Sequence, residues 1–161
     1  MLKWIRRSFY VISTVFVGLV LLISLLNIFS SPEGPAFLGH KGYTVISGSM
    51  EPTLKVGDYI VVQIKGYDKL VEKEVISFEN GGSIVTHRIE KVMPDGSLVT
   101  RGDANQMDDL LAVTKEEYIG TVHWRIPFLG QIMIWLQNPL IFSLIMATIA
   151  TRLAVLIIVK K

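Results

Sequence analysis

The sequence predicts a mostly β domain with an N-terminal transmembrane helix and a second, C-terminal transmembrane helix. Three observations lead to this fold class: apolar runs at both ends, short β-type runs between them, and an uneven distribution of charge. Half of the 161 residues are hydrophobic. The mean hydropathy of +0.47 exceeds what a soluble domain of this length usually has, so the excess must be localised.

The first apolar run extends from Phe9 to Phe29 and contains no charged residue. As a helix, this run would span roughly 32 Å at about 1.5 Å per residue, which matches the hydrocarbon core of a bilayer. A cleavable secretory signal has a shorter apolar region of about 7–15 residues and a clean small-residue cleavage site. Because prolines are interspersed with Gly34 and Ala36, the nearest small residues, we expect an uncleaved anchor.

The second apolar run, residues 139–159, carries a single charge at Arg152. An arginine at the centre of a bilayer costs about 3 kcal/mol, and less if its side chain reaches toward the lysines at the C-terminus. Residues 128–138, just before this run, mix apolar side chains with two glutamines and a tryptophan. This composition predicts an interfacial segment that leads into a second span.

The distribution of charge orients the chain. All 14 acidic residues lie between Glu33 and Glu117, where ten basic residues leave a net charge of −4, while the ends carry only positive charge. By the positive-inside rule both termini are cytoplasmic. The predicted organisation is therefore a cytoplasmic N-terminus (1–8), an anchor (9–29), an extracytoplasmic β-rich domain (30–138), a second span (139–159) and a cytoplasmic C-terminus (160–161).

The middle of the chain is expected to form strands. Six short runs rich in β-branched and aromatic residues are separated by turn signals such as Asn80-Gly81-Gly82 and Pro94-Asp95-Gly96. The predicted strands are Tyr43–Ser47, Asp58–Lys65, Glu74–Phe78, Ser83–Val92, Ser97–Arg101 and Tyr118–Trp124. The net acidic charge of this region argues against nucleic acid as a partner.

The stretch VISGSMEPTLKVGDYIVV holds one serine at a corner. Gly48 allows a sharp bend before Ser49 and Pro52 ends any regular element just after it. Such a serine is either a polar turn residue or an exposed nucleophile. The second interpretation requires a base elsewhere in the chain.

Three histidines are candidate bases: His40 in a glycine-rich loop, and His87 and His123 on apolar strand patterns. Neutral imidazole can accept a proton near neutral pH, and a carboxylate normally orients it. The loop RGDANQMDD offers three such carboxylates, Asp103, Asp108 and Asp109. Spacing alone does not choose among these residues. The histidines are too dispersed to suggest a metal site, and the absence of cysteine excludes disulfides and thiolate chemistry.

The order SGSMEPTL, then VTHRI, then RGDANQMDD resembles the type I signal peptidases, in the branch shared by the endoplasmic-reticulum complex, archaea and some Gram-positive bacteria. The resemblance covers residues 43–125 and implies the signal-peptidase β-fold. It implies that Ser49 is the nucleophile, His87 the general base and Asp109 the residue that orients it, with Asp103 in a supporting role. Most bacterial members have lysine where this chain has His87.

The same resemblance implies a substrate and a place in the cell. The backbone N–H of Ser49 and the side chain of Ser47 would form the oxyanion hole, and Val45, Ile46 and Val85 are expected to line shallow pockets for small side chains. The implied substrates are pre-proteins that bear signal peptides, cleaved at the plasma or endoplasmic-reticulum membrane without a cofactor. The lipid bilayer is a partner, and accessory subunits are left open.

Two alternatives come from other classes. A serine–lysine autoprotease on a membrane anchor would use Lys91 or Lys115 as its base and would be active without His87. A non-catalytic β-module that binds exported chains would use Ser49 only as a turn residue. The three hypotheses differ in whether Ser49 and His87 are needed for cleavage.

Overall fold

The computed structural model describes residue 4 and residues 11–22 and 36–159, without the side chains of 153–159. The chain divides into two compact units, Phe29–Ile132 and a second unit made of Met1–Ile28 and Met133–Lys161. The predictions for residues 1–8 (apart from residue 4), for both ends of the 9–29 anchor, for residues 30–35 and for 160–161 lie outside the described residues.

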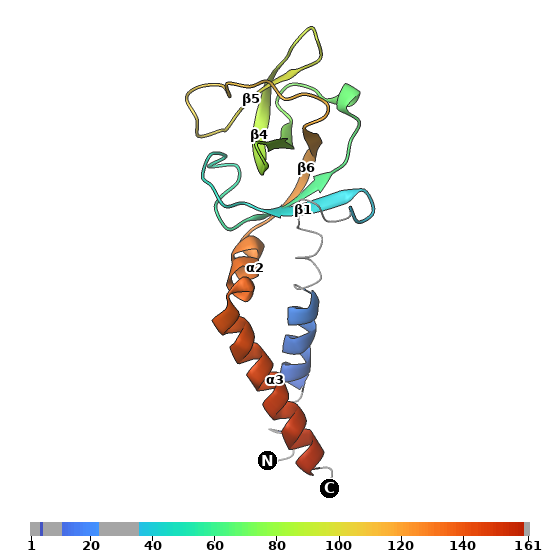
Figure 1. The fold of residues 1–161 in the computed structure, drawn as a ribbon, viewed down its shortest axis with the longest axis vertical. Helices are drawn as coiled ribbons and strands as arrows, with labels where there is room; N and C mark the ends of the chain where they lie inside the picture. Colours follow the sequence, from blue (N-terminus) through green and yellow to red (C-terminus); the bar gives the residue numbers. More distant parts are fainter. Residues whose placement is uncertain (1–3, 5–10, 23–35, 160–161) are drawn as a thin grey trace. The chain divides into compact units, whose positions relative to one another are not determined.

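The first unit contains a six-stranded antiparallel sheet with strand order β1-β2-β6-β3-β4-β5 (Figure 1). β6, the last strand in the chain, lies between β2 and β3, so strands that are distant in sequence are hydrogen-bonded neighbours in the sheet. The strands are β1 His40–Thr44, β2 Tyr59–Gln63, β3 Val75–Asn80, β4 Ser83–Val92, β5 Leu98–Arg101 and β6 Tyr118–Ile126. The prediction of a mostly β domain is confirmed.

The observed strands follow the predicted ones with one notable shift. β4 has the predicted bounds, and the Gly81-Gly82 turn before it adopts positive φ values of 58° and 79°, which glycine permits. β1 instead begins at His40, which the sequence placed in a loop, and ends at Thr44. The prediction that the strand runs on to Ser47 was wrong, because the chain turns away after Val45 toward the corner that bears Ser49.

Two apolar clusters form the core of the sheet domain. One contains buried residues of β3, β4 and β5 together with Leu70 and Val113. The other packs β1 and β2 against Met50 and Leu54 of the loop between them. In β3, Ile76 belongs to the first cluster and its neighbour Val75 contacts the second, so the two clusters lie on opposite faces of the sheet.

The second unit is helical. α3 spans Pro139–Val159, the bounds predicted for the second span. The short helix that precedes it, α2, Leu129–Gln137, begins in the first unit and ends in the second. Residues Val11–Leu22, inside the predicted anchor, also form an apolar helix. Among the described residues no single helix is long and apolar enough to cross a membrane, whereas Leu129–Gln137 and Pro139–Arg152, bent by 82° at their break, reach that length and apolarity together.

Arg152, the charge inside the predicted second span, has a polar contact within this helical unit. Its Nη2 donates a hydrogen bond to the hydroxyl of Thr14 at 2.8 Å. Thr14 lies on the helix Val11–Leu22, so the contact joins the two apolar helices. Polar side chains in apolar helices are usually satisfied in this way, by a neighbouring helix.

Candidate active site

Ser49 lies in the loop between β1 and β2, with buried anchors directly after it. Met50 and Leu54 are 2% and 3% exposed and pack into the cluster beneath the loop, while Ser49 itself is half-buried. The N–H of Glu51 donates to the carbonyl of Gly48 at 3.0 Å, which closes a turn around Ser49. The hydroxyl of Ser49 lies 3.3 Å from the hydroxyl of Ser47, so the two predicted residues are brought together.

His87 lies on β4 with its side chain almost buried. Its Nδ1 is 2.6 Å from Oδ2 of Asp109, and the ring packs edge-on to Phe78 with centroids 6.3 Å apart. A carboxylate at Nδ1 favours the tautomer that carries the proton there and leaves Nε2 as the acceptor. The structure therefore brings His87 and Asp109 together from parts of the chain 22 residues apart.

Thr100 is the residue of this cluster that the sequence analysis missed. Its hydroxyl donates to Oδ2 of Asp109 at 2.6 Å, and its carbonyl accepts the N–H of Asp109 at 2.8 Å. Thr100 is fully buried, and the Asp109 side chain is 23% exposed, so the contact is partly shielded from water. The only sequence signal was the alternation in β5, which places Leu98 and Thr100 on the same face.

Gly102 lies where Ser49 and His87 approach each other. A Cβ on Gly102 would be 2.5 Å from the carbonyl oxygen of Ser49 and 3.0 Å from Nε2 of His87. The N–H of Ala104 also donates to the Ser49 carbonyl at 2.9 Å. In the described part of the chain no hydrogen bond joins the Ser49 hydroxyl to His87, and such bonds are often long before substrate binds.

Asp103 binds arginine and threonine rather than histidine. Arg88 donates to both of its carboxylate oxygens, from Nε at 2.8 Å and Nη2 at 2.7 Å, and the hydroxyl of Thr53 donates to Oδ2 at 2.5 Å. The hydrogen bonds from Arg88 are the main reason that the pKa of Asp103 is lowered from its ordinary value. Asp103 thus ties the loop after Ser49 to β4.

The other candidate acids and bases lie elsewhere. Asp108 has a half-exposed side chain and pairs with Arg101 at 3.4 Å. His40 and His123 group with the indole of Trp124 on β1 and β6, with the rings of His40 and Trp124 stacked. Of the lysines considered as bases, Lys115 is 3.9 Å from Asp68 and Lys91 is exposed at the end of β4.

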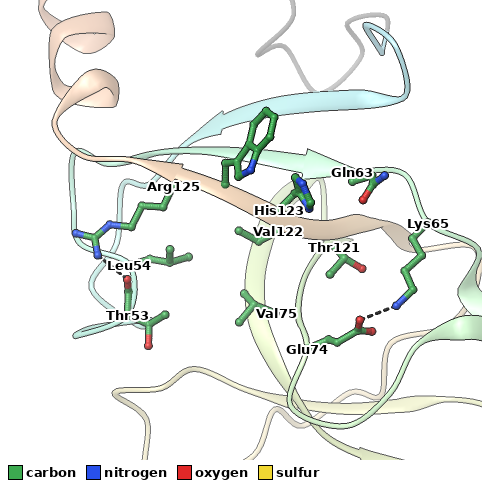
Figure 2. Close-up of a pocket in the computed structure, with 11 residues that line it drawn as sticks. Thr53, Leu54, Gln63, Lys65, Glu74, Val75, Thr121, Val122, His123 and Arg125 are labelled. Carbon is green, nitrogen blue, oxygen red and sulfur yellow. Dashed lines mark hydrogen bonds and ion pairs between the residues drawn. The ribbon is translucent and has the colours of Figure 1, made fainter.

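The residues expected to line substrate pockets are spread over different surroundings. Val45 packs against the cluster below the Ser49 loop, Val85 packs against the cluster on the opposite face, and Ile46 is 78% exposed. A separate groove of about 580 Å³ lies along β6, with Thr53, His123 and Arg125 on its walls and the Lys65–Glu74 ion pair on one side (Figure 2). Within the described residues no group of three or more His, Asp or Glu side chains could hold a metal ion.

A hydroxyl, an imidazole and a carboxylate are the groups that nucleophilic acyl transfer requires. Here the carboxylate contacts the imidazole, and the free edge of the imidazole faces the backbone of the segment that carries the hydroxyl. The chemistry open to this cluster is cleavage of an amide or ester through a covalent intermediate.

Comparison with known proteins finds relatives that are all named as signal peptidases or as catalytic subunits of the signal peptidase complex. The chain is 28% identical over 148 residues to the signal peptidase complex catalytic subunit SEC11 of Candida albicans, covering 84% of this chain and 86% of that protein. It is 33% identical over 120 residues to signal peptidase I W of Bacillus subtilis, covering 71% of this chain and 63% of that protein. It is 36% identical over 109 residues to SEC11 of Leptosphaeria maculans, covering 59% of this chain and 63% of that protein. No family model matches the chain.

Proposed function

We propose that this chain, which belongs to the type I signal peptidases in the branch of the endoplasmic-reticulum complex and some Gram-positive bacteria, removes signal peptides from exported pre-proteins. Its similarity to proteins named as signal peptidases supports its assignment as a signal peptidase hydrolase. The proposal adds a mechanism, a set of residues and a location. The single observation that carries the mechanism is the 2.6 Å contact between His87 and Asp109, with Nε2 of the same ring at Gly102 beside the Ser49 backbone.

In this mechanism the hydroxyl of Ser49 attacks the carbonyl carbon of the scissile peptide bond. Nε2 of His87 accepts the hydroxyl proton and then gives it to the leaving amine of the mature protein, which departs as the C–N bond breaks. Asp109 holds the Nδ1 proton and stabilises the imidazolium. A water molecule, deprotonated by His87, then attacks the acyl-enzyme ester; the bond to Oγ of Ser49 breaks, His87 returns the proton to that oxygen, and the signal peptide leaves with a free carboxylate.

The negative charge that develops on the oxygen of the attacked carbonyl must be stabilised by hydrogen-bond donors. The backbone N–H of Ser49 and the hydroxyl of Ser47 are the proposed pair, supported by the 3.3 Å separation of the two serine hydroxyls. Ser47 is exposed, so its hydroxyl can rotate toward a bound substrate. Thr100 would keep the carboxylate of Asp109 oriented during both steps.

The proposed substrate is an extended segment with small side chains at the first and third positions before the cut. Val45 and Ile46 precede Ser49 along the chain and are the residues proposed to contact it, with Val85 on β4 as the third. A shallow surface pocket admits alanine and rejects larger side chains through steric overlap.

The proposed location is a membrane, with the sheet domain on the extracytoplasmic side and both termini in the cytoplasm. The apolar helices Val11–Leu22 and α3, together with the positive charge at both ends, support this arrangement. The membrane is the plasma membrane, or that of the endoplasmic reticulum in a eukaryote. The SEC11 relatives are named as subunits of a complex, so accessory membrane subunits are proposed as partners.

The test is cleavage, by the full chain in membranes, of a membrane-bound precursor whose signal peptide ends in Ala-x-Ala. Wild type should cut it, Ser49→Ala and His87→Ala should not, and a bulky residue at the first position before the cut should stop cleavage. His40→Ala and His123→Ala serve as matched controls and should cut normally. A fluorophosphonate probe should label wild type but not Ser49→Ala.

The alternatives make different predictions for the same panel. Activity retained in His87→Ala but lost in Lys91→Ala or Lys115→Ala would point to a serine–lysine protease. Wild-type membranes that neither cut the precursor nor take up the probe would favour a non-catalytic binding module.

A further inference from the structure

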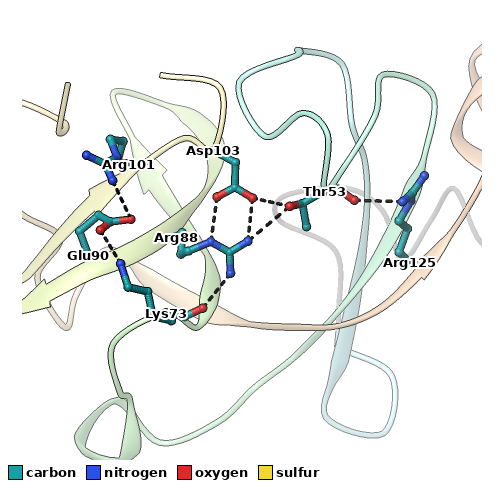
Figure 3. Close-up of polar contacts among 7 residues, drawn as sticks. All are labelled: Thr53, Lys73, Arg88, Glu90, Arg101, Asp103 and Arg125. Carbon is teal, nitrogen blue, oxygen red and sulfur yellow. Dashed lines mark hydrogen bonds and ion pairs between the residues drawn. The ribbon is translucent and has the colours of Figure 1, made fainter. Parts of the chain in front are cut away.

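Thr53, which follows Ser49 by four residues, is held from two sides (Figure 3). Its hydroxyl donates a hydrogen bond to the carboxylate of Asp103. Arg88 of β4 donates two further hydrogen bonds to the same carboxylate. The carbonyl of Thr53 accepts a hydrogen bond from Nη1 of Arg125 on β6 at 3.0 Å. The segment after Ser49 is therefore attached both to the strand that carries His87 and to a strand across the sheet.

Arg125 has a second partner, the carboxylate of Asp58. Nε of Arg125 lies 2.6 Å from Oδ2 of Asp58, whose side chain is 4% exposed. The same oxygen accepts the backbone N–H of Lys55 at 2.8 Å. A carboxylate buried to this extent needs a paired cation, so the contact is held firmly.

Asp58 also fixes the other end of the Ser49 loop. The N–H of Val45 donates to the carbonyl of Asp58 at 2.9 Å, and the N–H of Gly57 donates to the carbonyl of Val45 at 2.9 Å. Val45 comes before Ser49 and Thr53 comes after it. Both flanks of the loop are thus joined at its base to the residues that Arg125 binds.

We propose that Arg125 is a positioning residue that sets the place of the Ser49 hydroxyl relative to His87; this inference rests on the proposed function. Its guanidinium joins a buried carboxylate and a main-chain carbonyl of one loop, and it touches none of the reacting atoms of the proposed mechanism. Loss of this clamp would let the loop shift with respect to the imidazole. A displacement of about 1 Å at a reacting group can lower a rate by about a hundredfold.

The experiment measures kcat and KM for a membrane-bound precursor whose signal peptide ends in Ala-x-Ala, with the full chain in membranes. Arg125→Gln should lower kcat roughly tenfold to a hundredfold while KM stays within about twofold of wild type. Arg125→Lys should have a kcat between those of Arg125→Gln and wild type. A lysine can pair with Asp58, but it lacks the second guanidinium nitrogen that binds the Thr53 carbonyl. The rate of labelling by a fluorophosphonate probe should fall in parallel with kcat.

The matched control is Lys65→Gln. The Lys65–Glu74 pair has the same 2.6 Å length and lines the same groove as Arg125, but Lys65 binds Glu74, the residue just before β3, rather than the Ser49 loop (Figure 2). We expect wild-type kcat in this variant. Equal losses in Lys65→Gln and Arg125→Gln would overturn the proposal, since they would reflect general destabilisation.

Failure of this inference differs from failure of the proposed function. If wild type cleaves, Ser49→Ala does not, and Arg125→Gln cleaves with wild-type kcat, the clamp has no positioning role. If wild type does not cleave the precursor, the function itself fails. Should Arg125→Gln not accumulate in membranes, Arg125→Lys decides: a lowered kcat with unchanged KM supports the proposal, and a wild-type kcat overturns it.

Discussion

Oδ2 of Asp109 receives two short contacts, from His87 and from Thr100, each at 2.6 Å. Asp108, its neighbour in sequence, faces Arg101 with a half-exposed side chain. Asp109→Asn should therefore lower kcat by about three to four orders of magnitude, because an amide no longer fixes the histidine tautomer. Asp108→Asn should stay within about twofold of wild type. Precursor cleavage by the two variants compares them directly, and a crippled Asp108→Asn beside a normal Asp109→Asn would contradict the proposed roles.

Asp103 makes stability depend on pH. Hydrogen bonds from Arg88 lower its pKa in the folded protein. A carboxyl whose pKa is lowered in the folded protein stabilises the fold at pH values above its pKa in the unfolded chain, which is about 3.9 for aspartate. This contribution is lost as the pH falls toward the folded pKa. The thermal midpoint of Asp103→Asn should therefore lie below that of wild type at neutral pH, and the gap should narrow below about pH 4.

Thermal unfolding of the detergent-solubilised full chain from pH 3 to pH 7 measures this gap. Asp68→Asn is the control, because the Asp68 side chain is 85% exposed and its ion pair with Lys115 is 3.9 Å long. It should follow the wild-type curve throughout. A gap between Asp103→Asn and wild type that stays constant in acid would mean that the Arg88 contact does not act through ionisation.

At the scale of elements, the glycine that follows β5 determines whether two loops can meet. A Cβ on Gly102 would come within 3.0 Å of the Ser49 carbonyl and of Nε2 of His87. Gly102→Ala should therefore lower kcat at least tenfold by pushing these groups apart. Gly66→Ala is the control, since nothing lies within 4 Å of a Cβ there. Cleavage rates and thermal midpoints of both variants should be measured, and wild-type cleavage by Gly102→Ala would contradict this packing.

The elements that the sequence predicts well are those with local signals. β4 appears with its predicted bounds because a two-glycine turn precedes it and its alternation is regular. The roles of Ser49, His87 and Asp109 rest on motifs and stay predictions, although the structure does bring His87 and Asp109 into contact. The end of β1 was missed, since Val45 turns away through contacts with residues at the end of the next loop. Thr100 and Arg125 were missed for the same reason. Their importance depends on partners far along the chain, which no local pattern reveals.

At the scale of the whole molecule, the charge distribution makes a prediction about topology that the fold alone does not. The 14 acidic residues all belong to the middle of the chain, and the ends are purely basic. By the positive-inside rule, we predict that residues 30–138 lie outside and that both ends lie in the cytoplasm. Lys69 and Lys73, exposed in the segment between β2 and β3, then provide trypsin sites on the outer side.

Trypsin added to sealed, right-side-out vesicles should cut between Lys65 and Lys73 and leave tags at both termini attached to their helices. The exposed lysines of this segment, Lys69 and Lys73, lie on a short 3₁₀ helix and in a turn rather than in the sheet, so cleavage there does not require the sheet to unfold. Permeabilised vesicles are the control and should lose the tags as well. If the Lys65–Lys73 segment were protected while the tags were lost from sealed vesicles, the sheet domain would face the cytoplasm. Exported pre-proteins could then not be its substrates, because their cleavage sites emerge on the other side of the membrane.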